Sequence, residues 1–408
     1  MRFASQIRKV VTFALVAAML SVTLSTGVSG VRAQDAQDAP VENGASQVSI
    51  VMTSDDDGSC VLDYTSAAAG PITFTVKNES AASLTEVELL SNDRILGEKE
   101  NIAPGLPPVN FTVTLGGGTY QIYCPGAGTE LQDFTVTGEV VEPSGSIADI
   151  LAEGAAGYGN YVSGVIESMV TAVATLDAAI QAGDLEGAKV AYANARSFYE
   201  RAESNVEGFI LEGFDPTDNA GNLDYLIDMR ASNLDPAVGW HGFHAIERDL
   251  FEAGAISEGT RQLSTALVAN VGTLATVAQT IEFNPEDLAN GAASLLEEVQ
   301  ANKITGEEEA YSHIDLVDFA GNVEGAEQAF AFLEPGLTMI DPDLTAQIRE
   351  QFDAVKALLD TYKDPEQLGG YMIYTEELKA SDAAALSRAV QALQEPLSQI
   401  AEKVATAG

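Results

Sequence analysis

The hydrophobic pattern of this chain changes its period once, and the change divides the chain into two kinds of structure. Up to residue 138, apolar residues mostly alternate along short runs rich in β-branched and aromatic side chains, as in strands. From residue 146 onward the period is that of an α-helix. A linker-like segment, 139–145, lies between them. The sequence therefore predicts a multidomain β + α protein: a β-sandwich over 46–138, then an all-α helical bundle domain over 146–408.

The expected elements can be placed within each part. Six runs are predicted to be strands: Ser46–Met52, Ile72–Val76, Val87–Leu90, Val109–Val113, Thr119–Tyr123 and Phe134–Val136. In the second part we expect about seven to nine helices, enough for one large bundle or two four-helix bundles. The candidate N-caps are Ser146, Asn284, Thr305 and Asp341, and the third forms a capping box with Glu308.

The N-terminal segment 1–33 has the three parts of a secretory signal peptide. Basic residues come first, an apolar run from Val10 to about Val22 follows, and small residues lead to Ala33. The apolar run is too short for a permanent membrane span. We expect cleavage near Ala33, a disordered leader over 34–45 and export of the mature chain. No transmembrane segment is expected in the mature chain.

The charge of the chain excludes one class of partner. The formal net charge is −41, and it would become −45 without the four basic residues of the signal segment. A nucleic-acid backbone would be repelled by such a protein, so we expect no nucleic-acid partner. The ordinary explanation of so much acid is solubility. A field that attracts cations is the second explanation.

Histidine is scarce, and its placement indicates a metal site. Of the three histidines, two lie in the stretch 239–247, and His244 precedes Glu247 by three residues. On a helix these two side chains share one face and can converge on one cation.

A second acidic pattern precedes this stretch. Glu200, Glu203 and Glu207 lie at i, i+3 and i+7 of one expected helix, so their carboxylates share a stripe. Such a stripe is ordinarily a solvated face. Together with His244, however, it offers the carboxylate oxygens that hard cations prefer. Asp224, in the acidic loop 214–235, is a further candidate ligand, although loop aspartates usually form turns.

Two familiar metal motifs are absent. A thermolysin-type protease needs His-Glu-x-x-His, whereas His241 and His244 enclose Gly and Phe. A di-iron carboxylate bundle needs Glu-x-x-His twice, and here the order is reversed and occurs once. A mononuclear or loosely packed site fits better. Glu308 is assigned to helix capping rather than to this site.

The two cysteines, Cys60 and Cys124, both fall in the predicted β-sandwich. In an exported protein one disulfide is the default for such a pair. The alternative is a second metal site in which thiolates act beside Glu86, Glu88 or Glu98. A blue-copper site is excluded, because the β-domain contains no histidine.

Several motifs resemble the EfeO family of periplasmic iron-uptake proteins, over essentially the whole chain after the signal segment. In the second part they resemble its imelysin-like, peptidase-family helical domain, and in the first its cupredoxin-like β-sandwich. The motifs are Lys303-Ile304-Thr305-Gly306-Glu307-Glu308, Tyr311-Ser312-His313-x-Asp315-Leu316-x-Asp318-Phe319, Asn322-Val323-Glu324-Gly325-Ala326, Gly242-Phe243-His244-x-x-Glu247 and Glu100-Asn101-Ile102-Ala103-Pro104-Gly105.

The resemblance implies a function and a ligand set. It implies a protein that binds iron, Fe3+ or Fe2+, and works with a membrane iron permease and a periplasmic haem peroxidase. The implied helical-domain ligands are Glu200, Glu203, Asp224, His244 and Glu247, with Asp218 as the rival of Asp224. Copper and zinc are alternative metals, and a second site involving Cys60, Cys124, Glu86 and Glu98 is the β-domain candidate.

Three functions follow for testing. The first is capture and delivery of iron, with no bond broken in a substrate, although ferrous oxidation by the β-domain is a subsidiary hypothesis. The second is an imelysin-type zinc metallopeptidase that uses His244 and Glu247. The third is a surface or polysaccharide-binding protein in which a metal only stabilises the fold.

Overall fold

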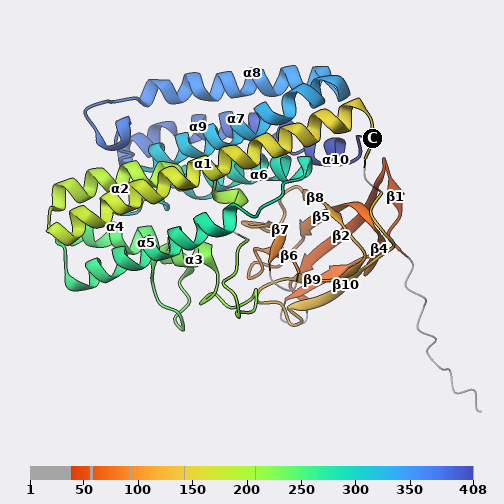
Figure 1. Cartoon of the computed structure of the whole chain (residues 1–408), viewed down its shortest axis with the longest axis horizontal. Coiled ribbons are helices and arrows are strands. Elements are labelled where there is room, and N and C mark those ends of the chain that lie inside the picture. The colour runs from red at the N-terminus through yellow and green to blue at the C-terminus, as the bar shows by residue number, and fades with distance from the viewer. Residues whose placement is uncertain (1–37, 56–57, 92–93, 142, 207, 408) are drawn as a thin grey trace, which may run out of the picture. The chain divides into compact units, whose positions relative to one another are not determined.

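The computed structural model describes residues 38–55, 58–91, 94–141, 143–206 and 208–407 (Figure 1). The predicted signal peptide and Glu207 lie outside the described residues. The order of strands followed by helices is the predicted one. In the described residues of 139–145 no helix or strand is present.

In its described residues, the first part consists of two five-stranded sheets that enclose one hydrophobic core. In the first sheet β2 pairs in parallel with β5, and β5 pairs antiparallel with β8. In the second sheet β10 pairs in parallel with β4 and antiparallel with β9. The strands are β1 (Val41–Glu42), β2 (Ala45–Thr53), β3 (Ser59–Leu62), β4 (Ser66–Ala68), β5 (Gly70–Asn78), β6 (Val87–Leu90), β7 (Ile95–Lys99), β8 (Val109–Leu115), β9 (Gly118–Tyr123) and β10 (Leu131–Thr137).

All six predicted strands are present, and β1, β3, β4 and β7 were not predicted. The first of these corrects the expected disordered leader, because β1 lies within 34–45 and pairs with the start of β2. The turn between them is Asn43-Gly44, and its positive φ angles of 52° and 94° are those that Asn and Gly adopt in a tight hairpin. The core is built on Phe74, which stacks on Phe111 at 5.1 Å and meets Phe134 edge-on at 5.3 Å.

The second part is all-α, and its long helices share one continuous core. Helix α7 packs against α1, α2, α6 and α8. The helices are α1 (Ser146–Ala182), α2 (Leu185–Glu200), α3 (Leu223–Asp228), α4 (Gly242–Glu247), α5 (Glu258–Ala278), α6 (Pro285–Glu298), α7 (Asp315–Ile340), α8 (Pro342–Leu359), α9 (Glu376–Leu397) and α10 (Ile400–Ala405).

By length and apolar composition alone, α1 could also cross a membrane. Its apolar stripe, however, is buried against other helices of this domain. Leu151, Val162, Met169 and Leu176 are among its fully buried side chains, and the helix packs against α2, α5 and α7. The hydropathy of α1 is therefore accounted for by the core that it helps to form.

The cap predictions divide evenly. Asn284 forms a capping box with Asp287 at the start of α6, and the Asp341 side chain accepts from the amide of Leu344 at the start of α8. Ser146 is itself the first residue of α1, so it is not the cap. No helix starts at Thr305, whose hydroxyl donates to the carbonyls of Ala301 and Asn302. The predicted capping box with Glu308 is wrong.

The edge of the sandwich formed by β7 and β8 contacts α6 (Figure 1). The buried ammonium of Lys99, at the end of β7, lies 2.8 Å from a carboxylate oxygen of Glu297 near the end of α6. The side chain of Asn290 donates to the carbonyl of Thr112 in β8 at 2.6 Å. These contacts bring the glutamates beside Lys99 close to the C-terminal end of α6.

Candidate metal centre

A buried set of charged residues fills the middle of the helical domain, and we call it the central cluster. Its members come from α2, α3, α4, the end of α6 and the chain around the start of α7, so segments distant in sequence converge on it. The acidic members are Glu200, Glu203, Asp228, Glu247, Glu298, Glu308, Glu309, Asp315 and Asp318, and the basic members are Arg196, Arg230, His244 and Lys303.

The predicted convergence of His244 and Glu247 is present. Both side chains are buried on α4, and Nδ1 of His244 lies 3.4 Å from Oε2 of Glu247. The other oxygen of Glu247 accepts from the backbone amides of Tyr311 and Ser312 at 2.8 and 2.7 Å. These amides fix the carboxylate and leave one of its oxygens facing the imidazole.

The second nitrogen of His244 faces two carboxylates that were not predicted as ligands. Nε2 lies 3.2 Å from Oε1 of Glu308 and 3.6 Å from Oδ1 of Asp228. Ligand atoms of His244, Asp228 and Glu308 lie within 4.8 Å of one another, and so do those of His244, Glu247 and Glu309. The imidazole therefore stands between two groups that could each hold a cation.

The predicted acidic stripe is only partly correct. Helix α2 ends at Glu200, and Glu203 lies in a short 3-10 turn, Glu203–Asn205. The two carboxylates still converge, because oxygens of Glu200 and Glu203 lie 3.3 and 3.7 Å from the ammonium of Lys303. Ligand atoms of Glu200 also lie within 4.8 Å of those of Glu308 and Asp318.

Asp224 is not in either group around His244. Its carboxylate accepts a hydrogen bond from the hydroxyl of Tyr199. Its rival Asp218 is exposed and accepts from the amide of Ala220, which is the ordinary role of a turn aspartate. Asp228, one turn beyond Asp224 on α3, is the loop-side aspartate that reaches the imidazole.

The cluster contains its own cations. The ammonium of Lys303, fully buried, lies 3.4 Å from Glu298 and 3.4 Å from Glu308, in addition to its contacts with Glu200 and Glu203. The guanidinium of Arg196, also fully buried, contacts Asp228 and Glu200 and lies 2.9 Å from Glu309, 3.2 Å from Glu308 and 3.2 Å from Asp318. The acidic members nevertheless outnumber the basic ones.

Burial and the neighbouring charges shift the pKa values of the acids in both directions. Burial raises the pKa of Glu203 and of Asp318 well above the usual range, and it raises the pKa of Asp315 to about 7. Burial and the charge of Glu247 raise the pKa of Glu309 to about 8. Although burial opposes it, Lys303 holds the pKa of Glu308 well below its usual range. At neutral pH the cluster therefore retains protons that a metal cation can replace.

Several buried oxygens of the cluster have unused acceptor capacity. Among the described residues, Oδ1 of Asp318 and Oδ2 of Asp315 have no hydrogen-bond partner. Oε2 of Glu200 accepts no hydrogen bond either, and its contact is the ion pair with Lys303. Buried acceptors normally find donors, so these atoms are oxygens with which a cation could make contact.

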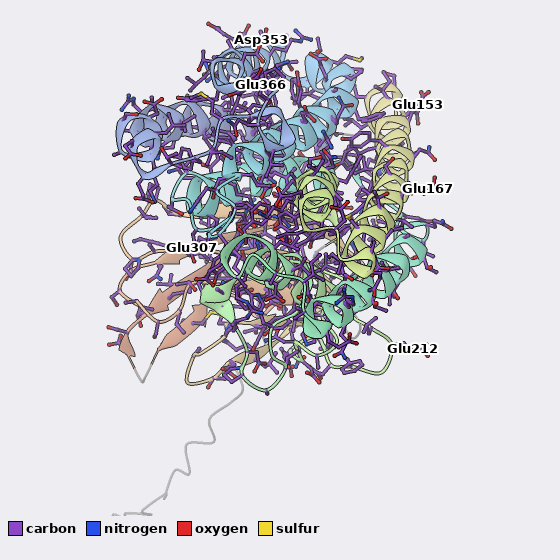
Figure 2. All side chains as sticks on the ribbon, turned by 90° about the vertical axis from the view of Figure 1, so that its left-hand side faces the viewer. Glu153, Glu167, Glu212, Glu307, Asp353 and Glu366 are labelled. Carbon is purple, nitrogen blue, oxygen red and sulfur yellow. A yellow bond between two sulfur atoms is a disulfide. The ribbon has the colours of Figure 1, made fainter. Side chains whose placement is uncertain are left out.

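Most of the acidic residues elsewhere have the ordinary solvated role. Figure 2 shows Glu153 and Glu167 of α1 and Asp353 of α8 on the outside of the helices, where all three are exposed. Glu307 is exposed too, although its neighbours Glu308 and Glu309 are buried. The acidic residues thus fall into two sets, one solvated at the surface and one buried in the central cluster.

The β-domain contains a smaller acidic group. Carboxylate oxygens of Glu86, Glu88 and Glu98, on and beside β6 and β7, lie within 4.8 Å of one another. Oε2 of Glu88 is buried without a hydrogen-bond partner among the described residues, and burial raises the pKa of this residue to about 11. The group could hold a cation through oxygen ligands alone.

Cys60 and Cys124 form a disulfide. The thiolate alternative for the second site is therefore wrong, because neither sulfur is available as a ligand. The default assignment from the sequence, one disulfide, is the arrangement found.

The sequence reasoning missed Asp228, Glu308, Glu309 and Asp318. Glu308 and Asp318 lie in the motifs that carry the family resemblance, but the pattern after Thr305 indicated a helix start. The structure instead has turns over 304–306 and 308–312, and Glu308 is buried there. One local signal was available: Arg196 stands four residues before Glu200, a spacing at which opposite charges pair on a helix.

Fold and site together define a class of protein. It has a β-sandwich followed by an all-α domain, and the helical domain builds a buried histidine and carboxylate centre suited to a hard cation. The imelysin family model (Peptidase_M75) matches residues 154–400, and the chain belongs to this family.

Similar proteins extend the assignment over both domains. The chain is 33% identical over 359 residues to "Iron uptake system component EfeO" of Escherichia coli (strain K12), which covers 87% of this chain and 90% of that protein. The same figures hold for the protein of that name from Shigella flexneri. An "Efem/EfeO family lipoprotein" of Staphylococcus haemolyticus is 37% identical over 247 residues, 60% of this chain and 81% of that protein. The chain is thus EfeO-like, as its motifs predicted, and these relatives support a role in iron uptake.

Proposed function

We propose that this protein captures iron in the central cluster and delivers it to a membrane permease, as the periplasmic component of an iron-uptake system. The position of His244 between two carboxylate groups carries this proposal. One imidazole among many carboxylate oxygens suits iron better than copper or zinc, which favour more nitrogen or sulfur ligands. No bond in a substrate is broken, so the protein is not an enzyme in this proposal.

The proposed ligands are those nearest the imidazole. An ion on the Nε2 side would be held by His244, Asp228 and Glu308, and an ion on the Nδ1 side by His244, Glu247 and Glu309. Glu200 and Glu203 stand behind Lys303 and become ligands if that ammonium moves. Asp224 belongs to the surroundings of the site through its contact with Tyr199.

A second cation site is proposed in the β-domain, which we take to be cupredoxin-like because each of its sheets contains a parallel strand pair. The ligands would be Glu86, Glu88 and Glu98, and the site would hold iron before the central cluster receives it. Calorimetric titration of Glu88→Gln tests this: the variant should bind fewer iron ions per chain than the parent. Unchanged stoichiometry would disprove the second site.

The peptidase alternative is less well supported by the geometry. A metallopeptidase needs a carboxylate free to act as the general base toward a metal-bound water. Glu247 is occupied, since one oxygen accepts two backbone amides and the other faces His244. Peptide hydrolysis that a chelator abolishes would favour the alternative over capture.

The deciding experiment is calorimetric titration of the parent and of the double variant His244→Ala, Glu247→Ala with ferric citrate, ferrous iron, copper and zinc. Loss of two ligands should weaken iron binding by more than about a hundredfold, or roughly 2.7 kcal/mol. Equal iron affinity in the two proteins would show that the proposed site is wrong. Preference for zinc over both forms of iron would argue against the transport function.

A further inference from the structure

Arg230 occupies the boundary between the central cluster and the outside. It follows α3, and its Nη1 lies 3.1 Å from Oε2 of Glu298 and 3.1 Å from Oε2 of Glu308. Its side chain is 14% exposed, whereas the side chain of Glu308 is 0% exposed. The other two strong cations of the cluster, Arg196 and Lys303, are fully enclosed. Arg230 is therefore the cluster cation with a path to solvent.

The β-domain presents acids to this same boundary. Lys99 is tied to Glu297, the residue before Glu298, at 2.8 Å. This ion pair joins the two domains. Glu98 and Glu100 flank Lys99 in sequence, so acidic residues of the β-domain lie beside the contact. Part of Glu100 is exposed, but burial of its carboxylate, with the charges of Glu86 and Glu298, raises its pKa well above the usual range, and Arg230 opposes this shift. Its carboxylate therefore lies near both Glu298 and Arg230.

The side of His244 near Tyr311 is closed differently. The amides of Tyr311 and Ser312 are bound to Glu247, so backbone covers the site there. The ring of Trp240 lies 6.3 Å from that of Tyr311, and the guanidinium of Arg248 lies 4.9 Å above Trp240. A cation passing on this side would have to break the hydrogen bonds between these two amides and Glu247. At Arg230, only one side chain has to move.

We propose that Arg230 gates the central cluster, so that an iron cation enters from the β7 side when this guanidinium releases Glu298 and Glu308. The inference rests on the proposed iron-binding function and adds the route by which the cation reaches the central cluster. The incoming cation takes over both carboxylates, so their negative charge stays neutralised while the arginine swings out into solvent. Glu308 then passes the ion to His244, whose Nε2 is 3.2 Å from it. Glu98, on the β-domain side, attracts the cation to the boundary.

The first test compares two arginine variants in stopped-flow loading with ferric citrate and in release to a strong chelator. Arg230→Gln removes the proposed gate, and Arg248→Gln removes the same charge on the Trp240 side. We expect Arg230→Gln to accelerate both loading and release about tenfold, corresponding to roughly 1.4 kcal/mol of barrier. Arg248→Gln should leave both rates nearly unchanged. Circular dichroism and thermal unfolding establish that each variant is folded.

A second pair of variants tests the route without touching the cluster. Glu100 and Glu252 are both exposed, the former at the β7 boundary and the latter on the Tyr311 side, where its charge acts on that tyrosine. Glu100→Lys should slow loading, because it places a cation in the path. Glu252→Lys should not. This pair of variants tests the entry route even if Arg230→Gln fails to fold.

The outcomes are distinguishable. Iron binding by the parent, with acceleration in Arg230→Gln and slowing in Glu100→Lys alone, supports the gate. Iron binding by the parent with equal effects in both members of either pair overturns the gate and leaves the proposed function standing. If the parent binds no iron at all, the proposed function fails and the gate fails with it.

Discussion

Nε2 of His244 lies 3.2 Å from Oε1 of Glu308, a residue 64 positions further along the chain. The two residues belong to different parts of the helical domain, one on α4 and the other in the turns before α7. Their contact joins the predicted His-x-x-Glu pair to a set of buried acids and cations that local sequence patterns do not reveal. The metal chemistry proposed for this protein depends on that contact.

The first prediction concerns Glu308 and its neighbour. Glu308→Gln should weaken iron binding by more than about a hundredfold, because a charged ligand opposite His244 is lost. Glu307→Gln removes the same charge from an exposed position one residue away and should change the affinity little. Titration calorimetry of both variants measures the difference. Similar affinities in the two variants would mean that Glu308 is not a ligand.

The second prediction concerns the pH dependence of binding. The pKa of Asp315 is about 7 and that of Glu309 about 8, so both carboxyls carry protons at pH 6 and lose them by pH 9. Iron affinity should therefore rise across this range, and binding near pH 7 should release protons. Calorimetry in buffers of different ionisation enthalpy counts them. Binding without proton release would contradict the pKa shifts.

The third prediction concerns the stability of the metal-free protein. The ordinary pKa values of Glu309 and Asp315 are 4.5 and 3.8, so above about pH 5 the unfolded chain has lost protons that the folded state keeps until about pH 7 on Asp315 and about pH 8 on Glu309. The pKa of His244, raised above its ordinary 6.5 mainly by Asp228 against the effect of burial, acts in the same direction. The free energy of unfolding should fall as pH rises, by up to about 1.4 kcal/mol per pH unit for each proton.

Thermal unfolding of the metal-free and iron-loaded proteins at several pH values tests this. The metal-free Tm should fall from pH 5.5 to 8, and iron should raise it most at the alkaline end, where the cation replaces lost protons. The lowered pKa values of Glu308 and Asp228 affect stability only at more acidic pH. A metal-free Tm that rises over this range would contradict the prediction.

The fourth prediction concerns Lys303. Its ammonium is fully buried among four carboxylates, so Lys303→Met leaves buried negative charge without compensation. Such a loss typically costs about 3–5 kcal/mol of the free energy of unfolding. Iron should restore part of this stability, because a multivalent cation can neutralise the same acids. Urea denaturation with and without iron provides the measurement, and Lys379→Met, which removes an ion pair with exposed Glu376, is the control.

The sequence by itself determined the domain order, the six main strands, the disulfide partners and the pairing of His244 with Glu247. These depend on local periods, on cysteine number and on spacing within one helical turn, which a chain carries in any context. The Asn43-Gly44 hairpin was equally local, and its turn residues would have predicted β1.

Only the tertiary structure decided which acids accompany His244. Glu307 and Glu308 look alike in sequence, and the fold exposes one and buries the other. Asp224 and Asp228 share one short helix, yet Asp228 is the one whose carboxylate faces the imidazole. The physical reason is that a buried carboxylate persists only where cations and donors from other segments compensate its charge. Lys303, Arg196 and Arg230 supply that compensation, and the packing of α2, α6 and α7 brings them together.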